Sequence, residues 1–263
     1  MSKRCTLEVP VDSLESAVLA APFSTRLELC HDLPSEGWTP NMRMVERIRS
    51  VVDTHLVVMI RPRFAHSPLT LTVESFMATK SVMDASKEEI QAAAAAGANS
   101  VAIGLLQADG NVDMNACGEL AELARELKLE VAFLRTFDLL RDRARGMRDI
   151  TALGMKRVVT AGVLGWDAAA ATIEQRLAVL RNDSLNAQVA ANMNSSTRMK
   201  SGADIKNVST CDPVEIVPGG GVRASNAAQF MSVSPHLHAS CRRGGVIHLQ
   251  ELQQLQAIIT ANS

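Results

Sequence analysis

The stretch LVVMIRPR (residues 56–63) places five apolar residues in a row directly before two arginines that flank a proline. An uninterrupted apolar run of this length is typical of a strand buried on both faces, as in a parallel sheet. Arg61 and Arg63 would then follow the C-terminal end of that strand and, being two residues apart, project to the same side. A buried strand that ends in two permanent positive charges predicts a site at that end.

Short apolar stretches of this kind recur along the chain, and segments with helical periodicity separate them, such as residues 113–128 and 248–261. Within a further helical segment, Ser86 followed by Glu89 predicts the N-terminal cap of a helix. Alternating strands and helices force parallel strand pairing. The expected strands are residues 7–11, 26–30, 56–62, 100–106, 129–136, 157–162, 214–222 and 236–240.

Eight such units in 263 residues predict a single (β/α)8 TIM-type barrel over residues 1–263. An open doubly wound sheet is the alternative, and the length favours the barrel. Residues 182–213 break the rhythm, because they are rich in Ser, Asn and Asp. We interpret them as a polar surface insertion before the seventh strand, at the end of the barrel away from the active site.

The composition excludes several classes of protein. With 47% apolar and 21% charged residues, the chain can bury a large core. A net charge of −1 and 3% aromatic residues give no reason to expect a nucleic-acid or membrane partner. The cysteines are scattered without a C-x-x-C pair, and no apolar run reaches membrane-spanning length. We therefore expect a soluble, cytoplasmic protein without disulfide bonds.

Charged and small residues follow several of the expected strands, and in a barrel these positions meet at one rim. Two arginine forks at that rim would bind a carboxylate or a phosphate, and bare glycine amides would add further donors. The alternative is that the arginines pair with local carboxylates and that the glycines only form a tight turn. The candidate catalytic residues are Glu28, Arg61, Arg63, Arg135, Asp138 and His238, and the candidate anion-binding residues are Arg61, Arg63, Arg135, Gly219, Gly220 and Gly221.

Metal and nucleophile motifs are largely missing from the sequence. Neither H-E-x-x-H nor G-x-S-x-G occurs, and no Ser-His-Asp arrangement is evident. Cys30 lies on the same side of its strand as Glu28 and is the candidate metal ligand, although a lone buried cysteine is more often a packing residue. No organic cofactor is indicated.

Several short motifs occur in the order found in the CutC copper homeostasis family, which the chain resembles from residue 8 to residue 240. They are LEVPVDSLESA, RLELC, EGWTPN, VMIRPR, DGNVDM, FLRTFD, VVTAG, PGGGVR and HLHAS. The resemblance implies a (β/α)8 barrel, a cytoplasmic location, assembly into a homodimer or homotetramer, a role in copper homeostasis and binding of Cu(I).

The chain departs from the family pattern at two positions that bear on copper. The family has cysteine where this chain has Pro10, and that thiol and the one matching Cys30 are the proposed Cu(I) ligands. The family also has histidine where this chain has Leu134. Only Cys30 carries over, so the resemblance predicts weak Cu(I) binding.

Two functions therefore stand side by side. One is a Cu(I)-binding homeostasis protein that uses Cys30. The other is a TIM-barrel enzyme, or former enzyme, acting on a small metabolite that bears phosphate or carboxylate. A scaffold that acts through its oligomer surface is a third possibility.

Overall fold

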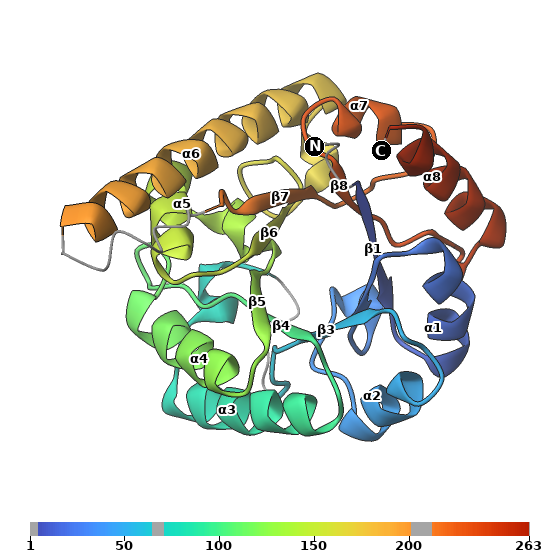
Figure 1. Ribbon diagram of the computed structural model, residues 1–263, viewed down its shortest axis with the longest axis horizontal. Helices are drawn as coiled ribbons and strands as arrows, with labels where there is room; N and C mark the ends of the chain where they lie inside the picture. The colour runs from blue at the N-terminus through green and yellow to red at the C-terminus, as the bar shows by residue number, and fades with distance from the viewer. Residues whose placement is uncertain (1–4, 65–70, 201–211, 263) are drawn as a thin grey trace.

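The computed structural model describes residues 5–64, 71–200 and 212–262, and eight parallel strands form a nearly closed barrel in it (Figure 1). The predicted barrel is confirmed, and each expected strand is present. The C-terminal ends of most strands come earlier than the apolar runs suggest. The strands are β1 (Thr6–Val11), β2 (Arg26–Leu29), β3 (His55–Met59), β4 (Ser100–Ile103), β5 (Glu130–Phe133), β6 (Arg157–Thr160), β7 (Glu215–Pro218) and β8 (His236–His238).

The strands are hydrogen-bonded in the order β7-β6-β5-β4-β3-β2-β1-β8, so β7 and β8 meet where the ring closes. Ser234, just before β8, donates a hydrogen bond from its hydroxyl to the carbonyl of Ile216 in β7 at 2.5 Å. Glu8 pairs with Arg26 on one side and with His238 on the other. This register fixes which side chains share a level inside the barrel.

Helices cover the outside of the ring, and Figure 1 shows them as an outer layer around the strands. A short hairpin, β9 (Arg242–Arg243) and β10 (Val246–Ile247), follows the last barrel strand. The helices are α1 (Leu14–Ala20), α2 (Met42–Arg49), α3 (Lys80–Ala95), α4 (Met114–Glu126), α5 (Arg143–Ala152), α6 (Ile173–Lys200), α7 (Ala227–Met231) and α8 (Leu249–Ala261).

The predicted helix start at Ser86 is wrong. The α3 helix begins at Lys80, and the Thr79 side chain accepts a hydrogen bond from the amide of Val82 as the N-cap. Ser86 lies inside the helix and is buried. A serine that can cap a helix is also tolerated within one, and the earlier threonine supplies the cap.

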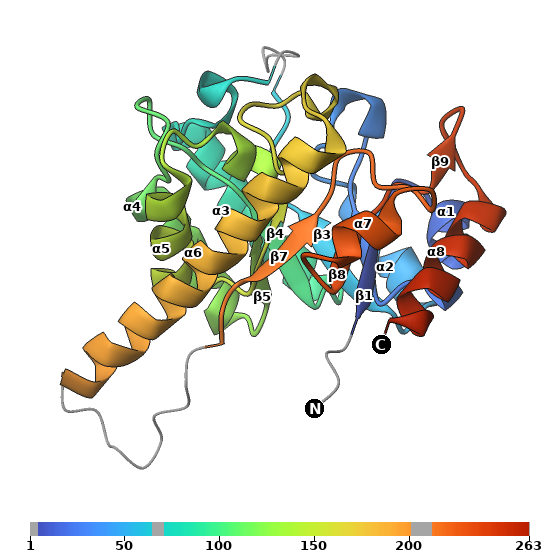
Figure 2. The ribbon, with the colours of Figure 1, turned by 90° about the horizontal axis from the view of Figure 1, so that it is seen from above.

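The interpretation of residues 182–213 as a polar surface insertion does not hold for residues 182–200, which continue α6. Asp183, Ala187 and Ala190 are buried, so this part of the helix packs on the barrel. Polar composition misled the prediction, because a long helix needs only one apolar stripe. Residues 201–211 of the same segment lie outside the described residues. Figure 2 shows α6 running away from the loops that follow the strands.

Alternate residues of each strand divide between two environments. Outward-facing side chains such as Leu7, Leu56 and Val58 join the large core beneath the helices. Inside the barrel, a small apolar cluster of Cys30, Val57, Met59, Ala102, Ala132 and Leu134 fills one part. Polar side chains occupy another part of the interior, among them Thr6, Glu8, Arg26, Glu28, Ser100, Arg157, His236 and His238.

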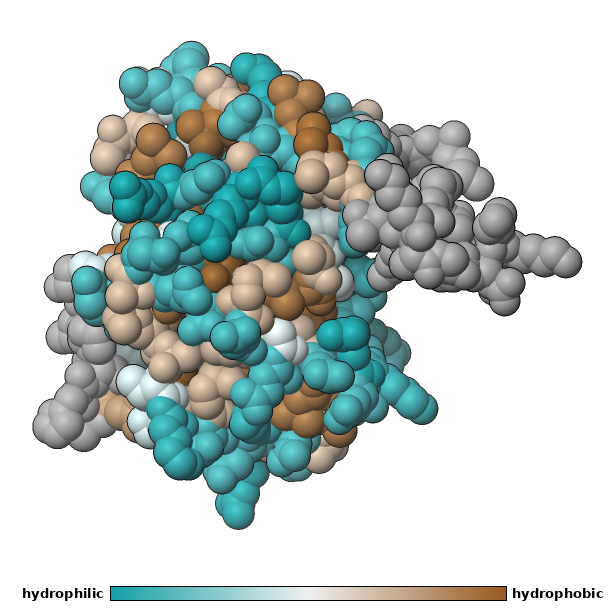
Figure 3. Space-filling model, turned by 90° about the vertical axis from the view of Figure 1, so that its left-hand side faces the viewer, coloured by the Kyte–Doolittle hydropathy of each residue, from teal (hydrophilic) through white to brown (hydrophobic). Residues whose placement is uncertain are grey.

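Among the described residues, no helix combines the length and the apolar character that crossing a bilayer requires. Figure 3 shows the side of the molecule on which α4, α5 and α6 lie, and hydrophobic residues there form separate patches among hydrophilic ones. Isolated apolar side chains are normal on the surface of a folded protein.

Candidate functional site

A cavity of about 450 Å³ lies at the C-terminal end of the barrel. The loops that follow the strands gather at this end, which is the upper side in Figure 2. In a barrel of this kind the site is built from these loops. The residues that line the cavity include Pro10, Asp12, Glu28, Glu36, Met59, Arg61, Leu134, Arg135, Trp166, Gly220, Gly221, His238, Ser240 and Arg242.

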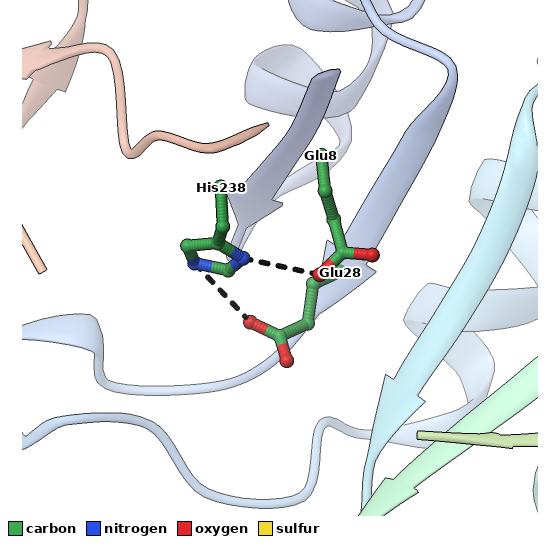
Figure 4. Close-up of side chains that lie close together, drawn as sticks. All are labelled: Glu8, Glu28 and His238. Carbon is green, nitrogen blue, oxygen red and sulfur yellow. Dashed lines mark hydrogen bonds and ion pairs between the residues drawn. The ribbon is translucent and has the colours of Figure 1, made fainter. Parts of the chain in front are cut away.

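The floor of the cavity carries a histidine between two glutamates, contributed by three adjacent strands, β8, β1 and β2 (Figure 4). Nδ1 of His238 lies 3.1 Å from Oε1 of Glu8, and Nε2 lies 3.8 Å from Oε2 of Glu28. All three side chains are nearly or fully enclosed, with exposed fractions of 13%, 1% and 5% for His238, Glu8 and Glu28. The histidine is therefore hydrogen-bonded to Glu8 and lies within ion-pair distance of Glu28.

The surroundings give the two glutamates opposite protonation behaviour. Burial alone would raise the pKa of Glu8, but the hydrogen bond from His238 and the charges of Arg26 and Arg157 hold it well below its usual range. Burial raises the pKa of Glu28 to about 7, and the charge of Glu8 adds to the rise against the opposing charge of His238. Two carboxylates whose environments separate their pKa values are typical of acid–base sites.

His238 is held as a proton donor. Burial lowers its pKa, but the hydrogen bond to Glu8 and the charges of both glutamates outweigh burial and raise it above the ordinary value. Because the ionised carboxylate of Glu8 can only accept, Nδ1 of His238 donates this hydrogen bond. Nε2 then faces Glu28 and the cavity.

Arg61 lies in the wall of the cavity with part of its guanidinium group unused. It is 7% exposed, and Nη1 donates to the carbonyl of Gly37 at 2.9 Å. Its Nε and Nη2 atoms are buried and have no hydrogen-bond partner in the part of the chain that the structure describes. The guanidinium stacks 3.9 Å from the centre of the Trp38 ring and 5.0 Å from that of Phe76. Burial lowers the pKa of Arg61 to about 10, so it remains charged at neutral pH.

Arg135 lies at the start of the turn after β5 and is fixed by its neighbours. Nη2 donates to the carbonyl of Trp166 at 2.7 Å, and the guanidinium stacks 4.5 Å from the centre of that ring. Nη1 lies 3.7 Å from a carboxylate oxygen of Glu36, which is half exposed. The charge of Glu36 also acts on Arg61. A single carboxylate thus faces two arginines across the mouth.

The glycines after β7 divide into two roles. The amide of Gly219 donates to Thr160, and its carbonyl accepts from Nη2 of Arg176 at 2.7 Å, so Gly219 belongs to the barrel wall. Gly220 and Gly221 line the cavity with left-handed φ values of +63° and +86°. A Cβ atom on Gly220 would lie 2.9 Å from that of Ala161, so this close turn requires glycine.

A profile of the CutC family matches residues 5–197 of the chain. The chain belongs to the CutC family. A CutC protein from Vibrio atlanticus is 31% identical over 237 residues, which is 89% of this chain and 81% of the relative. Copper homeostasis protein cutC homologs from mouse and human are each 34% identical over 157 residues, or 59% of this chain and 54% of theirs.

Solved structures agree on the fold. The crystal structure of CutC from Streptococcus agalactiae superimposes with a TM-score of 0.70 at 20% identity, covering 90% of this chain and 98% of that one. The barrel of 3-hexulose-6-phosphate synthase gives 0.60 at 16% identity, covering 96% of this chain and 99% of that one. At these identities the likeness concerns the fold alone.

Within this CutC barrel, the structure brings together most of the predicted site residues: Glu28, Arg61, Arg135, Gly220, Gly221 and His238 line the cavity. The expectation that Arg63 shares a side with Arg61 is wrong. β3 ends at Met59, so strand alternation no longer holds, and Arg63 pairs on the surface with Asp32 at 3.1 Å. It contacts the Trp38 ring at 5.4 Å.

Asp138 does not line the cavity. Its carboxylate accepts hydrogen bonds from the hydroxyl of Thr160 at 2.5 Å, from the amide of Ala161 at 2.8 Å and from Arg143 at 3.3 Å. Nε of Arg135 adds a longer contact of 3.4 Å. With its oxygens occupied by these donors, Asp138 positions Arg135 and joins the end of β6 to the turn after β5.

Cys30, the predicted copper ligand of this CutC chain, is fully buried in the apolar cluster inside the barrel and does not line the cavity. Burial and the negative charge of Glu28 raise the pKa of its thiol well above the usual value. Since a thiolate is the form that binds metal, this environment opposes ligation. Pro10 does line the cavity but offers no ligand atom.

The cluster of Glu8, Glu28 and His238 could hold a metal ion, because one ligand atom from each lies within 4.8 Å of the others. Carboxylate oxygens and an imidazole suit a divalent ion, whereas Cu(I) prefers thiolates. These three ligands therefore do not fit Cu(I) as a resident ion.

Three residues of the site were not expected from the sequence. Glu8 is charged in the middle of an apolar strand, and this was a signal that could have been used. Glu36 lies in a turn, within the EGWTPN motif but not singled out there, and Arg176 lies at the start of a helix that no motif marks. Only the folded chain places them beside the cavity.

Proposed function

We propose that this chain is an acid–base enzyme that acts on a small phosphate- or carboxylate-bearing metabolite bound at the barrel mouth. The observation that carries the proposal is the buried guanidinium of Arg61, whose Nε and Nη2 have no partner among the described residues. Leaving such donors buried and unpaired costs about 1–3 kcal/mol, and more for a charged group. An anion that accepts from both atoms would recover that cost.

The chemistry follows from the floor of the cavity. Glu28, with a pKa of about 7, is poised to take a proton from a bound substrate. His238, kept protonated by Glu8, would supply a proton through Nε2 to an oxygen of the same substrate. Arg26 and Arg157 contribute by keeping Glu8 ionised, since Nε of Arg26 bonds its carboxylate at 2.8 Å.

The evidence for a role in copper homeostasis comes from the family. The mouse and human relatives are named copper homeostasis proteins, and we place this chain in copper homeostasis on that ground. Direct Cu(I) binding would depend on Cys30, and we expect it to be weak because one buried thiol cannot complete a soft site. A cytoplasmic location fits the expectations from composition.

The anion site is tested by thermal unfolding with phosphate, sulfate or succinate at millimolar concentration. A ligand at one hundred times its Kd stabilises the native state by about 2.7 kcal/mol, which corresponds to a rise in Tm of about 5–10 °C. We expect Arg61→Met to abolish the rise given by succinate, and Arg63→Met, which changes a surface arginine two residues away, to retain it. Equal stabilisation of all three proteins by succinate would indicate a general salt effect and would overturn the proposal.

A further inference from the structure

Two groups of donors without a partner among the described residues, the guanidinium of Arg61 and the amides of Gly220 and Gly221, lie on opposite walls of the cavity. In the order of the ring, three strands separate β3 from β7 in either direction, so the two are diametrically opposed (Figure 1). Arg61 follows β3, and Gly220 and Gly221 follow β7. All three line the same cavity of about 450 Å³. The mouth therefore offers two places for negative charge rather than one.

The wall after β3 suits a carboxylate. Nε and Nη2 lie on one edge of the Arg61 guanidinium and point their hydrogens in parallel, which matches two oxygens of a planar acceptor. The remaining donor, Nη1, is used by the carbonyl of Gly37, and the Trp38 ring fixes the plane of the group. The fork is thus preorganised.

The wall after β7 suits a phosphate. Among the described residues the amides of Gly220 and Gly221 have no hydrogen-bond partner. The guanidinium carbon of Arg135 lies 3.5 Å from the position that a Cβ atom would take on Gly220, and Nη1 of Arg176 lies 4.0 Å from that on Gly221. Consecutive backbone amides beside two cations make a concave anion site with more donors than a carboxylate can use.

The charge balance of the mouth leaves room for a second anion. Arg61 and Arg135 face Glu36, which is half exposed and reaches Arg135 at 3.7 Å, while the charge of Asp138, already shared with Arg143, acts on Arg135 and Arg176. The nearby pair of Asp12 and Arg242 is neutral, with 2.7 Å between its charged atoms. The side chain of Glu36 cannot pair with the cations of both walls at once, because the two walls lie on opposite sides of the ring.

We infer that the ligand of this cavity carries an anionic group at each end, a carboxylate at Arg61 and a phosphate at Gly220 and Gly221, with its carbon chain over Glu28 and His238. The inference rests on the proposed function and narrows its substrate to phosphorylated carboxylic acids. Neither end alone would place the reacting carbon over the acid–base pair.

The test compares three probes by calorimetry: 3-phosphoglycerate, which has both groups, glycerol 3-phosphate, which lacks the carboxylate, and glycerate, which lacks the phosphate. Joining two sites in one ligand should give binding about 100-fold tighter than either half. We expect Arg61→Met to reduce the affinity for 3-phosphoglycerate to that for glycerol 3-phosphate while leaving the latter unchanged. Arg135→Gln should weaken both phosphate compounds, and Arg63→Met should change none.

The outcomes separate the two proposals. If both halves bind, with glycerate depending on Arg61, but 3-phosphoglycerate and the longer 4-phosphobutyrate bind no tighter than the halves, the two-ended ligand is refuted and the anion site stands. If no probe binds to wild-type protein, both proposals fall. Circular dichroism melts of each variant show whether it folds. Arg61→Lys keeps the charge without the paired donors of the guanidinium. It should also lose the tighter binding of 3-phosphoglycerate.

Discussion

At the scale of single residues, the chemistry of the site depends on two neighbouring buried glutamates whose pKa values shift in opposite directions. Glu8 and Glu28 both point into the barrel, yet of the two only Glu8 has arginines within ion-pair distance among the described residues. Arg26 and Arg157 neutralise it, whereas the same residues offer Glu28 only His238 within that distance. Desolvation therefore dominates at Glu28 and raises its pKa, while opposite charges dominate at Glu8 and lower it.

The raised pKa of Glu28 predicts a pH dependence of stability. Its folded pKa of about 7 exceeds its ordinary value of 4.5, so between these values the native state binds more protons than the unfolded state. The contribution of Glu28 to the free energy of unfolding therefore falls as pH rises through this window. Each unit of pKa shift corresponds to about 1.4 kcal/mol, so the fall attributable to Glu28 is a few kcal/mol.

Glu28→Gln isolates this contribution. Urea unfolding of wild type and variant between pH 4.5 and 8 should show the variant gaining stability relative to wild type as pH rises through the window. His238 adds a loss of the same sign in both proteins, because its folded pKa is also raised. A difference between the two proteins that does not change with pH would mean that Glu28 ionises normally.

Cys30 gives a second prediction at this scale. We expect the reduced protein to release Cu(I) to a high-affinity chelator, because the thiol is buried, resists ionisation and has no second thiol at Pro10. Cys30→Ser should behave like wild type in this competition. Retention of Cu(I) by wild type and its loss in the variant would show that the barrel opens to form a thiolate site.

At the scale of elements, the long helix α6 is tied to the barrel by a buried ion pair. Nε and Nη2 of Arg143 on α5 bond both carboxylate oxygens of Asp183 at 3.0 and 2.6 Å, and Nη1 reaches Asp138. The same arginine donates to Thr160 at the end of β6 at 2.8 Å. These contacts connect α5, α6 and the turn that carries Arg135, so they also support the anion site.

Asp183→Ala should destabilise the protein by about 3–5 kcal/mol, because it leaves Arg143 buried without its bidentate partner. Asp84→Ala, which breaks the exposed pair with Lys80 within α3, is the matched control and should cost less than about 1 kcal/mol. Urea unfolding measures both. A loss for Asp183→Ala as small as that of the control would contradict a stabilising role of the buried Asp183.

Pro10 shows how an element accommodates an unusual residue. β1 pairs with β8 only as far as Glu8 opposite His238, so Pro10 lies beyond the end of that ladder. Its missing amide hydrogen therefore costs no hydrogen bond to β8. Its ring lines the cavity beside the acid–base pair.

At the scale of the whole molecule, the barrel encloses charge at its N-terminal end. Arg157 bonds Ser100 at 2.7 Å and Glu130 at 3.1 Å, and Arg26 bonds Glu8. Barrel interiors are usually filled by branched apolar side chains. Here paired polar groups occupy part of the same space, and Nε of Arg157, which has no hydrogen-bond partner among the described residues, lies 3.6 Å from the carboxylate of Glu8.

The assembly of the whole molecule stays a prediction from the family resemblance, which implies a homodimer or homotetramer. Light scattering coupled to size-exclusion chromatography should give a mass of about two or four times 28.3 kDa. The measurement at several protein concentrations distinguishes a stable assembly from weak association. A mass of one chain throughout would contradict the prediction.

The sequence by itself determined the barrel and much of its rim. Eight apolar runs separated by helical segments leave few other topologies, and strand-end positions such as Arg61 and His238 follow from the regular geometry of strands. It also placed Glu28 correctly, since strand alternation is a local property.

Only the tertiary structure decided which of these residues act together. Arg63 faces the surface because the strand ends before it. The carboxylate of Asp138 accepts hydrogen bonds from β6 and α5, and apolar neighbours enclose Cys30. The partnership of Glu8 with His238 joins residues 230 positions apart. Pairing, burial and pKa depend on contacts between distant segments, and these exist only once the ring has formed.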